Sequence, residues 1–182
     1  MNLLLACFLL GVRFVTPITE NATGDGTGTK SAGRQEQSLI LVNETGKRVV
    51  VSADAFSKLH RQTITAKDHA GTNATYSGVA LADLLAAANI KLGKDLKGPL
   101  MANCLLIQAA DGYSVVFSLA EADPTMTDHV VLVADQKYGK PLDSREGPYR
   151  LVVPSDKRFS RWVRQVRVIS VEKAAKRAAS DH

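Results

Sequence analysis

The sequence predicts an α+β domain that contains a mixed β-sheet and few short helices. Many short runs of β-branched and apolar residues follow one another at regular spacing, and Gly-containing turns separate them. Only one segment shows the longer apolar repeat that an amphipathic helix requires. The chain has 182 residues, enough for one domain, and its 45% hydrophobic and 23% charged residues are typical of a globular protein.

The first part of this domain is predicted to contain a hairpin and a short helix. Residues 38–42 and 48–51 are rich in apolar and β-branched side chains, and Gly46 lies at the turn between them. Ser52 follows directly and is expected to cap a helix that reaches about Leu59.

The next part is predicted to contain two strands and the main helix. Residues 62–66 and 72–76 alternate as strands around a turn at residues 68–71. Residues 78–89 form the clearest helix, because large apolar side chains recur there at helical spacing. The residues of this stripe are Leu81, Leu84, Leu85 and Ala88.

The C-terminal half is predicted to be mainly β. Asp111 and Gly112 are a strong hairpin signal between the strands expected at residues 101–110 and 113–119. Ser118 is expected to cap one helical turn that ends near residue 123. The remaining predicted elements are strands at residues 130–134, 149–153 and 163–171 and a turn at residues 136–139.

Both ends of the chain differ from the domain between them, which is expected to span residues 38–171. Residues 1–15 contain an apolar run of the length found in signal peptides, so we expect export to the periplasm of a bacterium. A membrane anchor is the alternative, since no Lys or Arg precedes the run. Residues 16–37 are Gly- and Thr-rich and predict a flexible leader, and residues 172–182 predict a frayed helical tail.

Positive charge is concentrated near the C-terminus. The net charge is +5, and residues 145–177 contain ten Lys and Arg against three acidic residues. One compact basic segment fits a small anion or a local acidic partner better than nucleic acid, which would need a longer basic stripe. The alternative is that Arg161, Arg164 and Arg167 form the solvated face of a terminal strand.

Four segments follow one another in an order typical of one protein family. Residues 76–85 have the pattern aromatic-x-Gly-x-x-Leu-x-Asp-Leu-Leu, and residues 110–123 an Asp-Gly-Tyr hairpin before a short acidic helix. Residues 131–150 end in Gly-Pro-x-Arg, and residues 151–162 lead through a basic loop to Arg-Trp. This order resembles the molybdopterin-binding domain of the sulfite oxidase family, and the resemblance covers about residues 38–171.

The resemblance implies a mixed-sheet fold that holds a molybdopterin cofactor through basic side chains. Guanidinium groups suit bidentate contacts with phosphate. The residues that we predict to bind the cofactor or a similar small anion are Arg150, Lys157, Arg158 and Arg161. For Arg150, an ion pair with Glu146 or Asp111 is an equally good explanation that needs no ligand.

The metal ligand of the family has no counterpart here. Catalytic members hold molybdenum through a cysteine upstream of the Gly-x-x-Leu-x-Asp helix, whereas residues 66–75 of this chain contain no cysteine. Cys104 lies downstream in an apolar strand and is expected to be a buried small hydrophobe. A lone His69 in a turn is expected to be an exposed turn residue. We therefore predict no catalytic and no metal-binding residue.

These observations favour a non-catalytic or accessory module that binds a small anion or a pterin. The alternative is a molybdenum-cofactor-dependent oxidoreductase with atypical metal ligation. A nucleic-acid binder is disfavoured, because only Phe159 and Trp162 interleave with the basic residues. Membrane contact is expected only through the N-terminal segment.

Overall fold

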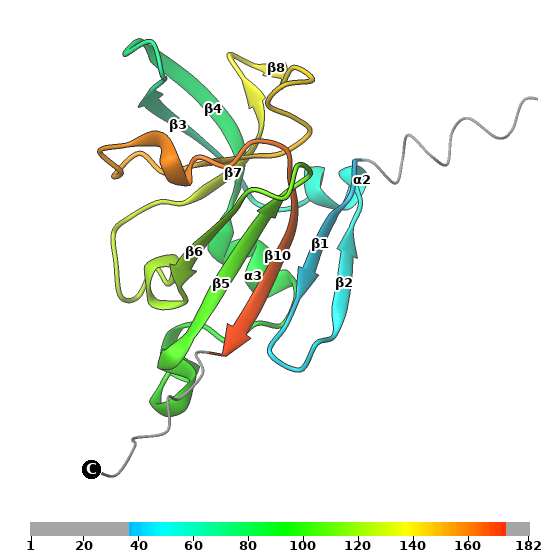
Figure 1. Cartoon of the computed structure of the whole chain (residues 1–182), viewed down its shortest axis with the longest axis vertical. Coiled ribbons are helices and arrows are strands. Elements are labelled where there is room, and N and C mark those ends of the chain that lie inside the picture. Colours follow the sequence, from blue (N-terminus) through cyan, green and yellow to red (C-terminus); the bar gives the residue numbers. More distant parts are fainter. Residues whose placement is uncertain (1–36, 174–182) are drawn as a thin grey trace, which may run out of the picture.

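The computed structural model describes residues 37–173, which fold into two five-stranded sheets (Figure 1). The first sheet has the order β2-β1-β10-β5-β6. The second has the order β3-β4-β7-β8, and β9 also pairs with β7. The predicted α+β class with few short helices is confirmed. The predictions of a signal peptide or anchor, of the leader before Gln37 and of the tail after Lys173 concern residues outside the described part of the chain.

The N-terminal hairpin forms as its sequence predicts. β1 (Leu39–Val42) and β2 (Arg48–Val51) pair antiparallel, and Gly46 takes the left-handed φ of +81° that the turn requires. The hydroxyl of Ser52 accepts a hydrogen bond from the Ala55 amide and so caps α2 (Ala53–Ser57), which ends two residues before the predicted position.

β3 (Arg61–Lys67) and β4 (Asn73–Ala80) form the second hairpin, and α3 (Leu81–Ala87) follows without a loop. The helix was expected to begin at Gly78, but that prediction is wrong by three residues. Gly78 lies in β4, where a Cβ atom would meet the Val133 carbonyl oxygen at 2.1 Å. This close approach of β7 makes the residue a strand glycine rather than the start of the helix.

Two 3-10 helices, η1 (Gly93–Asp95) and η2 (Gly98–Ala102), lead into the third hairpin. β5 (Asn103–Ala109) and β6 (Ser114–Ser118) pair around Gly112, whose φ is +88°. η3 (Ala120–Ala122) is capped reciprocally by Ser118 and Glu121, each accepting a hydrogen bond from the amide of the other. The predicted cap at Ser118 is therefore confirmed.

β7 (Leu132–Lys137) is shifted from the strand predicted at residues 130–134. Val130 lies outside the sheet and is 38% exposed, while β7 continues to Lys137 because its end pairs with β8 (Lys140–Pro141). Tyr138 and Gly139 form the turn with φ values of +52° and +73°. Positive φ at both central residues is the geometry that tight hairpins favour.

The last strands enclose the basic loop, which we define as residues 154–161. β9 (Arg150–Val152) precedes the basic loop. The last residues of the loop form η4 (Phe159–Arg161). β10 (Val166–Lys173) begins three residues later than predicted, because Gln165 has a φ of +52° and its amide bonds to the Glu146 carbonyl oxygen. β10 also extends through residues 172 and 173, which were expected to belong to the tail.

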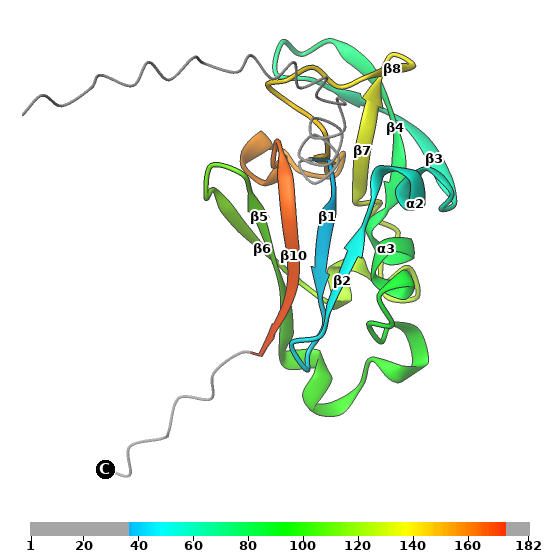
Figure 2. The same ribbon diagram turned by 90° about the vertical axis from the view of Figure 1, so that its right-hand side faces the viewer.

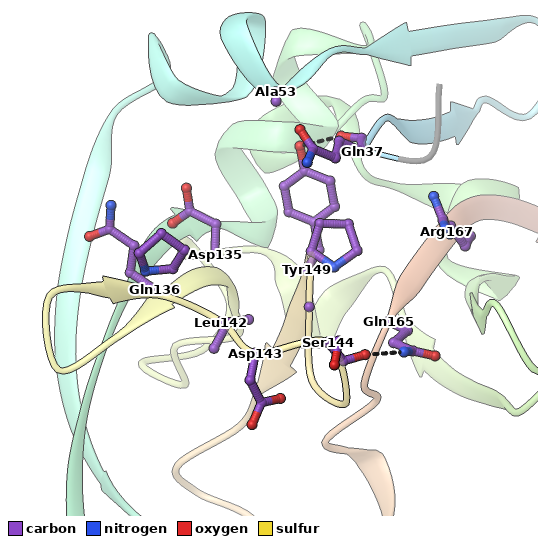
Figure 3. A pocket seen from close by; sticks show the side chains of 13 residues that line it. Gln37, Ala53, Asp135, Gln136, Leu142, Asp143, Ser144, Tyr149, Gln165 and Arg167 are labelled. Atoms are coloured by element: carbon purple, nitrogen blue, oxygen red, sulfur yellow. Dashed lines mark hydrogen bonds between the residues drawn. The ribbon is translucent and has the colours of Figure 1, made fainter. Parts of the chain in front are cut away.

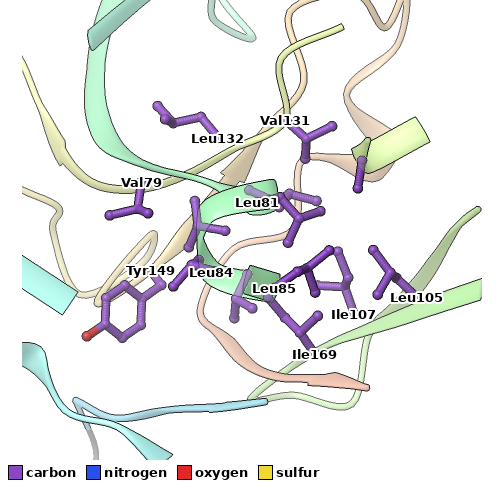
Figure 4. Packing of buried hydrophobic residues seen from close by; sticks show 14 of the residues in the cluster. Val79, Leu81, Leu84, Leu85, Leu105, Ile107, Val131, Leu132, Tyr149 and Ile169 are labelled. Atoms are coloured by element: carbon purple, nitrogen blue, oxygen red, sulfur yellow. The ribbon is translucent and has the colours of Figure 1, made fainter. Parts of the chain in front are cut away.

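The helix α3 lies beside the first sheet and below the strands of the second (Figure 2). The residues of its predicted stripe are buried. Leu85 points toward Ile107 and Ile169 of the first sheet, whereas Leu84 lies near Val79 and Tyr149 (Figure 4). Buried residues of both sheets belong to the same hydrophobic cluster. The helix therefore connects the two sheets through one core. Within residues 37–173 no helix is long and apolar enough to cross a membrane.

Candidate ligand-binding site

A cavity of about 410 Å³ lies between the β3–β4 turn and the basic loop. We call it the aromatic cavity, because the rings of His69, Phe159 and Trp162 contribute to its lining. The remaining lining residues are Lys67, Asp68, Gly71, Pro154, Asp156 and Lys157. The β3–β4 hairpin and the basic loop, which are far apart in the sequence, therefore line one cavity.

The rings of the aromatic cavity are held against one another. The centroids of His69 and Phe159 are 4.2 Å apart, and those of Phe159 and Trp162 are 4.9 Å apart at an angle of 81°. The indole of Trp162 is 5% exposed and donates a hydrogen bond to the Val153 carbonyl oxygen at 3.0 Å. Trp162 is thus anchored in the core. His69 is an exposed turn residue, as predicted, and it also packs on Phe159.

Lys157 lines the aromatic cavity, and Lys67 faces it from the end of β3. The two carboxylates of the lining already have cationic partners outside it. Asp68 lies 3.5 Å from the ammonium group of Lys137, and Asp156 accepts two hydrogen bonds from Arg161. Burial raises the pKa of Asp68, but hydrogen bonds from backbone amides and the charge of Lys137 outweigh it and lower this pKa.

Arg161 does not line this cavity, because its guanidinium group points toward β6 and η3. It bonds Asp156 at 2.6 and 2.9 Å and Glu121 at 2.8 Å, and it lies 4.3 Å from the centroid of the Phe117 ring. The hydrogen bonds to Asp156 raise the pKa of Arg161, so its charge is fixed. Arg161 therefore ties the basic loop to η3.

Arg150 is 1% exposed and lies in the core beneath the basic loop. One nitrogen of its guanidinium group bonds Glu146, which confirms one of the alternatives considered above. Arg150 also lies over the rings of Tyr76 and Trp162, at 5.7 and 5.5 Å. Three buried polar atoms here have no hydrogen-bond partner among the described residues, namely Nε and Nη2 of Arg150 and the hydroxyl oxygen of Tyr76. Burial raises the pKa of this Tyr76 hydroxyl.

The predicted basic residues therefore do not converge on one point. Lys157 lines the aromatic cavity, whereas Arg158 is exposed outside it at the start of η4. Nor do the other arginines form one strand face. Arg164 borders a cavity of about 240 Å³ beside Tyr113, and only Arg167 lies in β10.

Arg167 belongs to a separate cavity of about 620 Å³ (Figure 3). It lies on the opposite side from Asp135, and the ring of Tyr149 lies between them (Figure 3). Asp135 forms a two-point ion pair with Arg61, and the hydroxyl of Tyr149 donates to the Gln37 carbonyl oxygen at 2.9 Å. Burial, with a smaller effect of Asp135, raises the pKa of Tyr149 to about 12.

The donor atoms around the aromatic cavity do not fit a molybdenum centre. Its lining contains no thiolate, and no group of three His, Cys, Asp or Glu residues suited to a metal occurs in residues 37–173. Cys104 lies on β5 in the other sheet. It is half-buried rather than buried, because side chains alternate along the strand and Asn103 and Leu105 take the core side.

Sequence reasoning did not identify Lys67, Asp68 or Lys137 as neighbours of this site. Lys67 and Lys137 belong to the second sheet, and Asp68 lies in the β3–β4 turn. Only the pairing of β3 with β4 and of β4 with β7 brings them to the basic loop. Charged residues at strand ends beside a turn are common, so no local pattern distinguishes them.

Comparisons with known proteins agree with this fold. Residues 45–179 match the family described as the oxidoreductase molybdopterin binding domain. No curated protein gives a match. The fold is similar to that of the sulfane dehydrogenase SoxCD from Paracoccus pantotrophus, with a TM-score of 0.59 and 23% identity over 76% of this chain. The similar region makes up 38% of the SoxCD chain.

Proposed function

The chain belongs to the molybdopterin-binding domain family of the sulfite oxidases, and we propose that it is a non-catalytic member that binds a small anion at the aromatic cavity. The lining of this cavity supports the proposal. It offers positive charge and aromatic rings but no thiolate. Oxygen-atom transfer at molybdenum in this family depends on such a thiolate, as the resemblance described above implies.

The arginines support the same proposal. Arg150 and Arg161 correspond to basic positions of the family, yet carboxylates of this chain already bond both side chains. A cofactor phosphate would have to displace Glu146 from Arg150, or Asp156 and Glu121 from Arg161. Breaking such a pair costs more when it is buried, as it is at Arg150.

Metal analysis tests the proposal directly. The full chain is expressed in a host that makes the molybdenum cofactor, and the purified protein is analysed by mass spectrometry. We expect molybdenum far below one atom per chain, and no change in the Cys104→Ser variant. Stoichiometric molybdenum would contradict the non-catalytic proposal.

One observation favours the alternative, an oxidoreductase with atypical metal ligation. His69 contributes an imidazole to the lining of the aromatic cavity, and imidazole is a common metal ligand. In that case the purified protein would contain molybdenum, and the His69→Ala variant would lose it while retaining its fold. The Cys104→Ser variant would retain the metal.

We also propose export, which rests on the apolar run in residues 3–12. Cell fractionation of a bacterium that expresses the full chain should place the protein in the periplasm. Recovery only in the membrane fraction would favour an N-terminal anchor, and recovery only in the cytoplasm would contradict both.

A further inference from the structure

We infer that the anion bound at the aromatic cavity is a planar aromatic carboxylate. This inference rests on the proposed function, because it names the chemical class of ligand for the same site. Three features of the cavity support this inference. They are the arrangement of the aromatic rings, the positions of the lysines and the ion pairs that the arginines form within the chain.

The rings favour a planar ligand. Phe159 is half-buried and packs on His69 from the β3–β4 turn and on Trp162 from the end of the basic loop. Aromatic rings prefer tilted or offset contacts with other rings, and such contacts contribute beyond simple burial of apolar area. A flat ring entering the cavity would meet this aromatic wall, whereas a spherical inorganic anion would leave it in contact with water.

The lysines favour a negative charge on that ligand. Lys67 and Lys157 line the cavity, and neither has a carboxylate partner among the described residues. The two acids beside them have other cationic partners, since Asp68 pairs with Lys137, and Asp156 shares Arg161 with Glu121. The lining therefore presents two lysines without carboxylate partners beside its aromatic wall.

The arginines are not available to hold the charged group of the ligand. A guanidinium group would hold a carboxylate or a phosphate by a two-point grip. All three nitrogens of Arg161 bond carboxylates, Arg150 is buried against Glu146, and Arg158 lies outside the cavity. A lysine is a point charge that can hold either anion without this geometry, so the aromatic wall is the feature that favours an aromatic carboxylate over inorganic phosphate.

The single tryptophan of the chain provides the readout, because Trp162 lines the cavity and must give the only indole signal in an NMR correlation spectrum. The full chain is titrated with benzoate, with cyclohexanecarboxylate and with inorganic phosphate. We expect a saturable shift of the indole signal with benzoate. Cyclohexanecarboxylate has the same charge but no planar ring, and it should bind about 3- to 10-fold more weakly.

Two variants test the residues. Lys157→Gln removes one exposed charge and should weaken benzoate by about fivefold, with the indole signal of the free protein unchanged. Phe159→Leu retains apolar volume and should remove the preference for benzoate over cyclohexanecarboxylate. Lys97→Gln is the matched control, since Lys97 is an exposed lysine outside the lining, and it should leave benzoate affinity unchanged.

The outcomes separate this inference from the proposed function. If phosphate binds, benzoate does not, and Lys157→Gln weakens phosphate binding, the inference of an aromatic carboxylate is wrong, whereas the proposed anion site is retained. Equal affinity for benzoate and cyclohexanecarboxylate would also overturn the inference. If none of the three anions shifts the indole signal, both proposals fail.

Discussion

Asp123 shows how one buried carboxylate organises two loops. It is fully buried and accepts hydrogen bonds from the amide of Gly93 and from the amide and hydroxyl of Thr125. Burial raises the pKa of Asp123, but these hydrogen bonds outweigh it and lower the pKa below that of a free aspartate. The residue lies at the end of η3, so it connects the loop that contains η1 to the chain before β7.

Replacing Asp123 tests this role. Asp123→Ala should lower the free energy of unfolding by about 1 to 3 kcal/mol, because it leaves the amides of Gly93 and Thr125 without their side-chain acceptor. Asp123→Asn keeps one acceptor oxygen and should cost less. Urea unfolding monitored by circular dichroism gives both values, and an Asp123→Ala variant as stable as the wild type would contradict the assigned role.

The same residue predicts a pH dependence. Because the folded-state pKa of Asp123 is lowered, its stabilising contribution is complete above the unfolded-state pKa of about 3.9 and is lost as pH falls through the folded-state value. The difference in unfolding free energy between wild type and Asp123→Asn should therefore shrink on acidification from neutral pH. A difference that grows on acidification would reverse the sign of the proposed shift.

At the scale of elements, α3 is a short helix held by one apolar stripe. Leu81, Leu84 and Leu85 are each at most 1% exposed, whereas Asp83 lies on the outer side at 3.3 Å from the imidazole of His60. Leu84→Ala should lower the unfolding free energy by about 2 to 5 kcal/mol through the cavity it leaves. Asp83→Ala should change it by less than about 1 kcal/mol. Equal effects in urea unfolding would contradict the observed helix register.

The basic loop is joined to η3 by the ion pairs of Arg161. Its ion pairs with Asp156 and Glu121 are partly exposed, so Arg161→Gln should cost only about 1 kcal/mol of stability. The amide hydrogens of residues 154–161 should nevertheless exchange faster in this variant than in the wild type. Arg158→Gln is the control and should leave exchange unchanged, because Arg158 is exposed. Equal exchange in the two variants would show that the ion pairs do not order the loop.

The sequence predicted those elements whose signals are local. These elements depend on neighbours within a few residues of the sequence. They are the turns at Gly46 and Gly112, the helix caps at the serines and the apolar stripe of α3. The start of α3 could not be predicted, because the requirement for Gly78 comes from β7 more than 50 residues later. The same reason applies to the site: Arg161 was predicted as an anion ligand, and its partner Glu121 lies 40 residues away.

For the whole molecule, strand pairing connects the two ends of the domain. β1 pairs parallel with β10, so the first and last strands of the described chain are neighbours in the middle of one sheet. The same β10 pairs antiparallel with β5. The first sheet can therefore not be completed until the last strand is in place. The core between the two sheets contains buried residues of both.

This arrangement predicts that the domain unfolds as one unit. Trp162 fluorescence reports on the region beside the second sheet, and far-ultraviolet circular dichroism reports on all strands. Because Leu84 contacts the core shared by both sheets, the two probes should give the same urea midpoint, and Leu84→Ala should move both midpoints together. A fluorescence midpoint at lower urea would mean that the basic loop and its sheet open separately. The aromatic cavity would then be formed by a region less stable than the rest of the domain, and a ligand bound there should raise the fluorescence midpoint more than the circular dichroism midpoint.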